Sequence, residues 1–280
     1  MTCASQAAVL NIAGLTKTFK DRQVLKHLDF SVAPGEVVIV LGASGAGKTT
    51  LFKIVSGLME PSKGTINFDG KNLGELSNKD RRLVRREMGF IFQQFNLVRR
   101  MNALSNVLAG RSGYTSTWRV LLRRFTKPDI DLAKRALASV GLAEFIWQRA
   151  DSLSGGQQQR VAIARALAQQ CRFILADEPV ASLDPETSRA VLEMLKSIAA
   201  ERQVGVLCSL HQVDLARMYG DRIIGLKDGR IAFDAAACDV DDVMIDRLYS
   251  DKPAKGSAPP IETQNDFPAL AVTNNKAVLA

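Results

Sequence analysis

Short, uninterrupted apolar runs alternate with longer mixed segments along this chain. Three of these runs, Val37–Leu41, Phe173–Ala176 and Val204–Ser209, show no alternation between apolar and polar positions. A strand without such alternation is typical of a sheet covered on both faces, and such strands separated by helical stretches are typical of parallel sheets. The pattern therefore predicts an α/β fold with a mainly parallel core sheet.

Two further pairs of runs predict antiparallel pairing near the ends of the chain. Leu10–Phe19 and Val24–Val32 lie on either side of a short polar turn, and Ile223–Leu226 and Arg230–Phe233 on either side of an Asp-Gly pair. An Asp-Gly pair between apolar runs is a strong hairpin signal, because both residues tolerate a positive φ. We expect an antiparallel β subdomain at the N-terminus and a hairpin near the C-terminus.

The middle of the chain has a different character. From Ser77 to Arg149 there are few β-branched runs and many helix formers, which favours a mostly helical insert ending at about residue 160. From residue 249 to residue 280 the composition shifts to Lys, Pro, Ala, Ser, Thr and Asn, which predicts a disordered C-terminal tail. The predicted folded domain therefore spans about residues 8–248.

Composition and charge exclude several classes of protein. No run of 18 apolar residues is present, the N-terminus does not read as a signal peptide, and the four cysteines form no CxxC pair. We therefore expect a cytoplasmic protein without disulfides or a zinc site. The net charge of +8 is compatible with a nucleic acid, an anionic membrane or a merely solvated basic surface. No nucleic-acid motif accompanies it, so no nucleic-acid partner is expected.

The segment Gly42-Ala43-Ser44-Gly45-Ala46-Gly47-Lys48-Thr49 fits the phosphate-loop pattern GxxxxGK[ST]. It follows a predicted strand and precedes a predicted helix that includes Thr50, which is the context this motif requires. Backbone N–H groups in such a loop cradle phosphates, the lysine neutralises them, and the threonine hydroxyl ligates Mg²⁺. The loop predicts nucleoside triphosphate binding, but leaves open a kinase, a GTPase, a helicase or a transport motor.

A second motif narrows this choice. The segment Leu153-Ser154-Gly155-Gly156-Gln157 resembles the signature sequence of the ATP-binding-cassette (ABC) ATPases. Ser154 can cap the helix that follows, and the glycines leave the N–H groups of its first turn open to an anion. The resemblance implies that Ser154, Gly155, Gly156 and Gln157 contact the γ-phosphate of ATP held by an opposite cassette.

The resemblance extends to further positions in family order, about residues 8–248. It implies that Asp177 holds Mg²⁺ together with Thr49 and Gln93, and that Glu178 is the general base. The resemblance also implies that Gln93 contacts the attacking water and that His211 contacts the γ-phosphate as the switch histidine.

Two residues complete the implied ATP site. Asp184 matches the D-loop that crosses the interface between cassettes; a helix cap before Pro185 is the alternative, and the two roles are compatible. Phe19 resembles the aromatic residue that stacks on adenine, and a core phenylalanine is the alternative. The implied fold is a P-loop NTPase of the ABC cassette type, with an antiparallel β subdomain and a helical subdomain.

The resemblance also implies partners and a location. Because each ATP would be held between two cassettes, it implies a head-to-tail pair with a second copy of this chain. The absence of a membrane span implies separate permease subunits and a peripheral position on the cytoplasmic face of the inner membrane. The basic insert is where such cassettes meet their permeases, and its arginines allow contact with anionic lipid as well.

The finer resemblance is to the ATPases of phosphonate importers, which work with a periplasmic phosphonate-binding protein. It rests on segments 113–119, 176–185 and 210–216. An importer for phosphate or phosphite, and a cassette acting on ribosomes or DNA, are the alternatives that the sequence leaves open.

Overall fold

The computed structural model describes residues 8–250. The predicted tail at 249–280 lies almost entirely outside them. The six-stranded sheet has the order β10-β9-β3-β8-β7-β6, in which every neighbouring pair is parallel except the edge pair β9 and β10. The strands are β3 (Val37–Leu41), β6 (Met88–Phe92), β7 (Phe173–Asp177), β8 (Gly205–Ser209), β9 (Arg222–Lys227) and β10 (Arg230–Ala236). The predicted, mainly parallel core sheet is confirmed.

Both faces of this sheet are covered, as the unbroken apolar runs predict. Val37, Ile39 and Leu41 of β3 belong to one buried cluster, whereas Val38 and Val40 belong to the other. Successive side chains of a strand point to opposite faces, so an apolar residue at every position supplies two hydrophobic layers. The first layer packs against helices α3 (Ala103–Leu108), α5 (Lys127–Ser139), α6 (Gly155–Ala168), α7 (Pro185–Arg202) and α8 (Val213–Tyr219).

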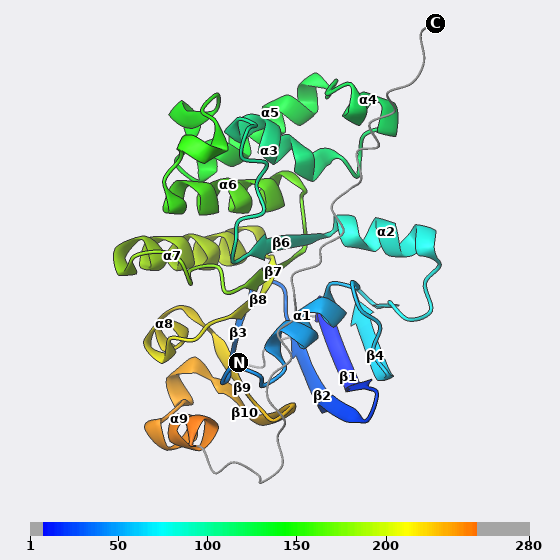
Figure 1. Ribbon diagram of the computed structural model, residues 1–280, viewed down its shortest axis with the longest axis vertical. Coiled ribbons are helices and arrows are strands. Elements are labelled where there is room, and N and C mark those ends of the chain that lie inside the picture. Colours follow the sequence, from blue (N-terminus) through cyan, green and yellow to red (C-terminus); the bar gives the residue numbers. More distant parts are fainter. Residues whose placement is uncertain (1–7, 251–280) are drawn as a thin grey trace, which may run out of the picture. The chain divides into compact units, whose positions relative to one another are not determined.

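The second layer packs against α1 (Lys48–Val55) and the antiparallel sheet. This sheet has the order β2-β1-β4-β5, with strands β1 (Leu10–Phe19), β2 (Arg22–Val32), β4 (Lys63–Phe68) and β5 (Lys71–Asn72). Figure 1 shows β1, β2 and β4 next to α1, with the helices of the middle segment gathered beyond β6. The predicted antiparallel subdomain is confirmed, and Asp228 and Gly229 turn the C-terminal hairpin with φ values of 48° and 75°.

The predicted helical insert needs one correction. Strand β6 (Met88–Phe92) lies inside the segment that we expected to be mostly helical from residue 77, and it forms the edge of the parallel sheet. This run, Met88-Gly89-Phe90-Ile91-Phe92, contains a single β-branched residue, Ile91, and a glycine, so its strand signal is weak. The helices of this region therefore divide into α2 (Asn78–Arg86) before the strand and the remainder after it.

The remaining elements are short. After β6 they are η1 (Ala109–Arg111), α4 (Thr117–Leu121), η2 (Ala143–Phe145) and η3 (Ala150–Ser152), and near the C-terminus η4 (Ala237–Asp239) and α9 (Asp242–Tyr249). Helix α6 continues to Ala168, beyond the expected end of the helical subdomain at about residue 160. Within residues 8–250 we find no helix that is both long and apolar enough to cross a membrane.

Candidate functional site

The loop from Gly42 to Gly47 connects the buried strand β3 to helix α1. A side chain at Gly42 would approach the carbonyl oxygen of Leu226 to 2.3 Å, and Gly47 has a φ of 109°. Both positions therefore require glycine. Helix α1 has no side-chain cap and no acidic residue in its first turn, so its first N–H groups are open to an anion.

The other residues of the loop differ in exposure. Ala43, Ser44 and Gly45 are exposed, Ala46 is buried, and Gly45 turns with a φ of 82°. Thr49 is exposed at the start of α1, and the neighbouring Thr50 is half-buried. The loop thus presents its backbone and the Thr49 hydroxyl to the outside, which is the arrangement that phosphate binding requires.

Lys48 lies under this loop with only 6% of its surface exposed. Its Nζ donates hydrogen bonds to the carbonyl oxygens of Gly42 at 2.6 Å and Ala43 at 3.3 Å. Burial lowers the pKa of Lys48, and the charges of Glu178 and Asp177 oppose that effect. The ammonium is therefore held near two carboxylates, at the place where a bound phosphate would meet it.

The first of these carboxylates belongs to Asp177, the last residue of β7. Burial raises its pKa, and a hydrogen bond from Ser209 partly offsets the rise. Ser209 Oγ donates this bond to Asp177 Oδ1 at 2.8 Å from the neighbouring strand β8, where Ser209 pairs with Asp177. No described residue donates a hydrogen bond to Oδ2, so this oxygen can bind a cation.

Glu178 follows Asp177 in a strained conformation. Its φ is 49°, a value that favours glycine, and its backbone N–H donates to Ser209 Oγ at 2.9 Å. Its Oε1 lies 2.5 Å from His211 Nε2. Because an ionised carboxylate only accepts hydrogen bonds, Nε2 must carry the proton in this contact. One serine and one histidine thus fix the backbone and the side chain of Glu178.

Parallel strand pairing explains why these distant residues meet. Phe92 of β6 pairs with Asp177 of β7, and Asp177 pairs with Ser209 of β8. Gln93, Glu178 and His211 follow these strand ends, and the phosphate loop follows β3 at the same edge. Ligands of open α/β sheets bind at this carboxyl edge. Gln93 and His211 are both exposed there.

The signature residues occupy the start of α6. Ser154 Oγ accepts a hydrogen bond from Gln157 N at 3.3 Å, and Gln157 Oε1 accepts one from Ser154 N at 2.9 Å, which forms a capping box. Ser154 is exposed, and Gly155 and Gly156 are half-buried. In the described part of the chain no hydrogen bond or ion pair joins these residues to the phosphate loop. Within one copy, therefore, no polar contact of the described residues links the signature residues to the phosphate loop.

Two predicted residues lie at the margins of the site. Asp184 Oδ1 accepts a hydrogen bond from Thr187 N at 2.9 Å and caps α7, so the alternative explanation of a helix cap is confirmed. Asp184 is nevertheless exposed. Phe19 ends β1 and is 42% exposed, with Lys17 Nζ 5.1 Å from its ring centroid. It is therefore not a core phenylalanine, and its ring is available for stacking.

Sequence reasoning missed Ser209 as a functional residue. The available signal was its position, because it is the one polar side chain that ends the run Val204-Gly205-Val206-Leu207-Cys208. A fully buried hydroxyl at the end of an apolar strand requires a hydrogen-bond partner. That the partner is the Asp177–Glu178 pair depends on strand order, which the sequence does not state.

Mg²⁺ is the metal that this set of donors fits. The Thr49 hydroxyl, the free Oδ2 of Asp177 and the Gln93 amide offer oxygen, which Mg²⁺ prefers to nitrogen and sulfur. Among residues 8–250 no group of three or more His, Cys, Asp or Glu side chains could form a closed metal cage. Mg²⁺ suits such an open site, since it commonly takes only one or two carboxylates and completes its shell with other oxygens, phosphates and water among them.

Comparison with known proteins agrees with this geometry. The sequence model of the family described as ABC transporter matches residues 25–181. The chain is 48% identical over 240 residues to the hypophosphite import ATP-binding protein HtxD of Stutzerimonas stutzeri, covering 86% of this chain and 70% of that protein. It is 44% identical over 248 residues to the phosphonates import ATP-binding protein PhnC of Lactobacillus gasseri, covering 88% and 95%.

Solved structures share the fold. A dimeric structure of MJ0796, described as a bacterial ABC transporter cassette, has a TM-score of 0.71 and 33% sequence identity, covering 81% of this chain and 98% of that one. A post-hydrolysis dimer of the same cassette, bound to ADP and Pi, has a TM-score of 0.69 and 33% identity, with the same coverage. The arrangement described above is therefore similar to one that binds adenine nucleotide in that protein.

Proposed function

The chain belongs to the ABC transporter family, and on that premise we propose that it is the ATP-hydrolysing subunit of a bacterial phosphonate importer. The observation that carries the ATPase activity is the contact of Glu178 with His211 at the sheet edge that also holds the phosphate loop. The observation that carries the import role is the identity of 44% to a phosphonate import subunit over 95% of its length.

The phosphate loop binds the triphosphate of ATP. Open N–H groups at the start of α1 and the ammonium of Lys48 neutralise its charge. Phosphate oxygens replace the carbonyl oxygens of Gly42 and Ala43 as acceptors for Lys48 Nζ. Phe19 stacks on the adenine ring, and its exposure of 42% leaves a ring face for this purpose.

Glu178 accepts a proton from the attacking water. His211 fixes its side chain, and Ser209 fixes its backbone, so the carboxylate is positioned before the water arrives. When ATP binds, His211 also reaches the γ-phosphate and Gln93 orients the water. Catalysis then depends on positioning and on neutralised charge, as in phosphoryl transfer generally.

Asp177, Thr49 and Gln93 would hold Mg²⁺ through their oxygens. When bound, the ion would neutralise charge on the β- and γ-phosphates. Ser209 keeps the Asp177 carboxylate turned with Oδ2 free, which is the oxygen available to the ion.

A second copy of the chain completes the site. Ser154, Gly155, Gly156 and Gln157 lie at a helix start suited to an anion, and no hydrogen bond or ion pair of the described residues joins them to the phosphate loop of their own copy. In a head-to-tail pair they face the γ-phosphate held by the partner, and Asp184 lies at the interface. The dimeric structures of the similar cassette MJ0796 support the formation of a pair.

The transported solute is assigned through relatives alone, because the cassette does not contact it. Proteins named for phosphonate import recur among the relatives, and one at 48% identity is named for hypophosphite import. A hypophosphite importer is therefore the second candidate. Import subunits among the relatives favour transport over action on ribosomes or DNA. Separate permease subunits, a periplasmic binding protein and a place on the cytoplasmic face of the inner membrane follow from the import role.

Growth on defined phosphorus sources tests this function. A strain lacking this chain should lose growth on a phosphonate as the sole phosphorus source, keep growth on phosphate, and recover with the wild-type chain. The Glu178→Gln variant serves as the inactive control and should not restore growth. Loss of growth on hypophosphite with growth on phosphonates intact would contradict the phosphonate assignment and support the second candidate.

A further inference from the structure

The segment between η1 and α5 exposes an unusual group of apolar side chains. On and directly after α4, Trp118 is 75% exposed, Leu121 70% and Leu122 62%. Figure 1 shows α4 at the outer end of the helical region, away from both sheets. Burying a large apolar side chain is worth roughly 1.5–3 kcal/mol, so three exposed together favour a partner that covers them.

The same segment is strongly basic. Arg119, Arg123 and Arg124 are exposed, and their side chains form no ion pair or hydrogen bond with any residue from 8 to 250. From Met88 to Pro128 the sequence contains no aspartate or glutamate. The partner of this surface must therefore be both apolar and negatively charged.

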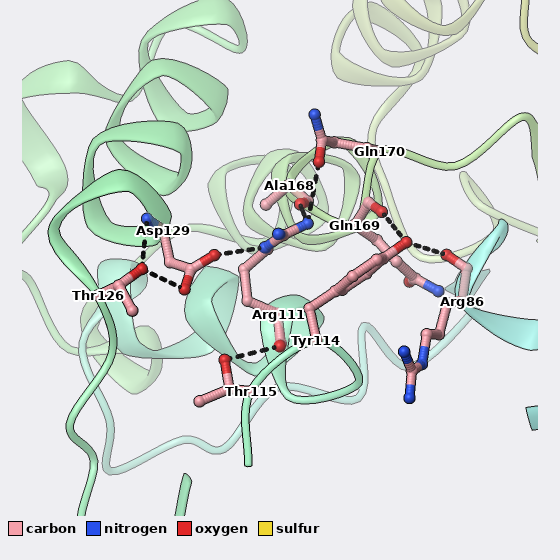
Figure 2. Close-up of polar contacts among 9 residues, drawn as sticks. All are labelled: Arg86, Arg111, Tyr114, Thr115, Thr126, Asp129, Ala168, Gln169 and Gln170. Carbon is pink, nitrogen blue, oxygen red and sulfur yellow. Dashed lines mark hydrogen bonds and ion pairs between the residues drawn. The ribbon is translucent and has the colours of Figure 1, made fainter. Parts of the chain in front are cut away.

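A cluster of polar contacts joins the two ends of the segment between η1 and α5 (Figure 2). Arg111, before α4, forms an ion pair at 2.8 Å with Asp129, after it, and both side chains are nearly buried, at 11% and 12% exposed. Thr126 Oγ1 donates a further hydrogen bond to Asp129 Oδ2 at 2.6 Å. The two ends of the segment are thus fastened to each other.

Tyr114 fastens the segment to the rest of the fold. Its ring lies between the guanidinium groups of Arg111 and Arg86, and its hydroxyl donates to the carbonyl oxygens of Gln169 at 3.1 Å and Arg86 at 3.3 Å. Figure 2 shows Tyr114 extending from this segment toward Gln169 at the end of α6. A segment whose ends are already fixed loses less conformational entropy when it binds a partner. These contacts therefore favour a docking role for α4.

We propose that α4 and the turn after it, residues 117–124, bind the anionic surface of a lipid bilayer. Tryptophan is enriched at the headgroup level, leucine enters the acyl boundary, and arginine pairs with anionic headgroups while its stem stays apolar. A stable protein interface covers about 800 Å² on each partner, more than three side chains supply. This inference does not depend on the proposed solute or on import.

The two tryptophans of the chain allow a direct test with vesicles. In the Trp147→Phe variant of the full chain, Trp118 is the only tryptophan reporter. Its emission should shift to the blue on addition of phosphatidylcholine–phosphatidylglycerol vesicles, and should not shift with phosphatidylcholine alone. The reciprocal Trp118→Phe variant reports from Trp147, which is similarly exposed at 70%, and should show no shift.

A charge-matched pair of variants tests the role of the arginines. Replacing Arg119, Arg123 and Arg124 with glutamine should lower the vesicle partition coefficient on the order of 100-fold, at about fivefold for each cation. The control replaces three exposed arginines elsewhere, Arg135, Arg189 and Arg230, and should change it far less. Both triple variants should have the circular dichroism spectrum and the rate of ATP hydrolysis of the wild-type protein.

Three results would overturn the proposal. One is an unchanged Trp118 emission with anionic vesicles, and another is an equal loss of binding in both triple variants. The third is binding only to membranes that contain the permease, which would assign this surface to a protein partner instead.

Discussion

Ser209 Oγ donates a hydrogen bond to Asp177 Oδ1 at 2.8 Å across the boundary between β8 and β7. The same oxygen accepts a hydrogen bond from the backbone N–H of Glu178 at 2.9 Å. One buried hydroxyl therefore orients the proposed Mg²⁺ ligand and the backbone of the proposed general base. Because Ser209 is fully buried and acts through Asp177 and Glu178, its role is that of a positioning residue.

Ser209→Ala should lower kcat about 10-fold with a small change in KM. The substitution leaves the Glu178 N–H without its acceptor and removes the hydrogen bond that opposes the raised pKa of Asp177. The acid limb of the kcat–pH profile should therefore move to higher pH. Ser56→Ala is the matched control, since Ser56 is also buried but bonds only near the end of α1, where its Oγ donates to the carbonyl oxygen of Lys53 and accepts from the backbone N–H of Leu58. An unchanged acid limb would refute the role of Ser209.

Glu178→Gln should reduce ATP turnover by about 10²–10⁴-fold and still allow ATP-driven dimerisation. The amide cannot take the proton of water, whereas the phosphate loop and the signature residues remain intact. Steady-state hydrolysis and size-exclusion chromatography with ATP measure the two effects separately. Glu193→Gln, at an exposed position of α7, is the control and should match the wild-type protein in both turnover and dimerisation. Substantial turnover by the Glu178 variant would exclude it as the base.

Asp177→Asn should stabilise the fold while abolishing hydrolysis. Burial raises the pKa of Asp177, so the folded state disfavours the ionised form. In the unfolded chain the Asp177 carboxyl loses its proton at a lower pH than in the folded chain. The free energy of unfolding therefore falls as the pH rises from about 4 through the pKa of the folded state. The variant should therefore melt a few degrees higher at neutral pH, at about 2–4 °C for each kcal/mol, with no advantage below about pH 4. A lower Tm at neutral pH would contradict this.

Ser154→Asp should separate the two roles of the signature serine. Aspartate caps helices as well as serine does, so the melting temperature should stay close to that of the unchanged protein. The added charge would face the γ-phosphate in the proposed pair, and ATP-driven dimerisation should be lost. Asn102→Asp is the control, because Asn102 caps α3 in the same way, and its dimerisation should be normal. Normal ATP-driven dimerisation of the Ser154 variant would refute the proposed contact.

Local sequence predicted the parts of the site whose geometry is local. The phosphate loop, the cap at Ser154 and the hairpin at Asp228 each depend on a few consecutive residues, and all three form as predicted. Strand β6 escaped prediction because its run is short and lies between helical segments. Ser209 and the contacts of Tyr114 escaped because they depend on which strands and helices are neighbours. Residues 32 and 55 positions apart meet there, and no local pattern encodes such a pairing.

Asp129→Asn should destabilise the fold only where the carboxylate is ionised. Burial opposes ionisation, but hydrogen bonds from Thr126 and Arg111 and the charge of Arg111 outweigh it and hold the pKa of Asp129 below its usual value. The stabilisation is then fully present above about pH 4 and is lost as the pH falls through the lower pKa of the folded state. At neutral pH the variant leaves the nearly buried Arg111 without its charged partner, at a cost of up to about 3–5 kcal/mol. Thermal melts at neutral and acidic pH should therefore show a large difference in Tm between wild type and variant, and this difference should narrow as the pH falls below about 4.

Asp131→Asn, two residues further on α5, should show little difference at either pH, because Asp131 forms no ion pair with the described residues. A difference in Tm that does not change with pH would mean that Asp129 acts through its shape alone. Its charge would then not be what joins the two ends of the segment that contains α4.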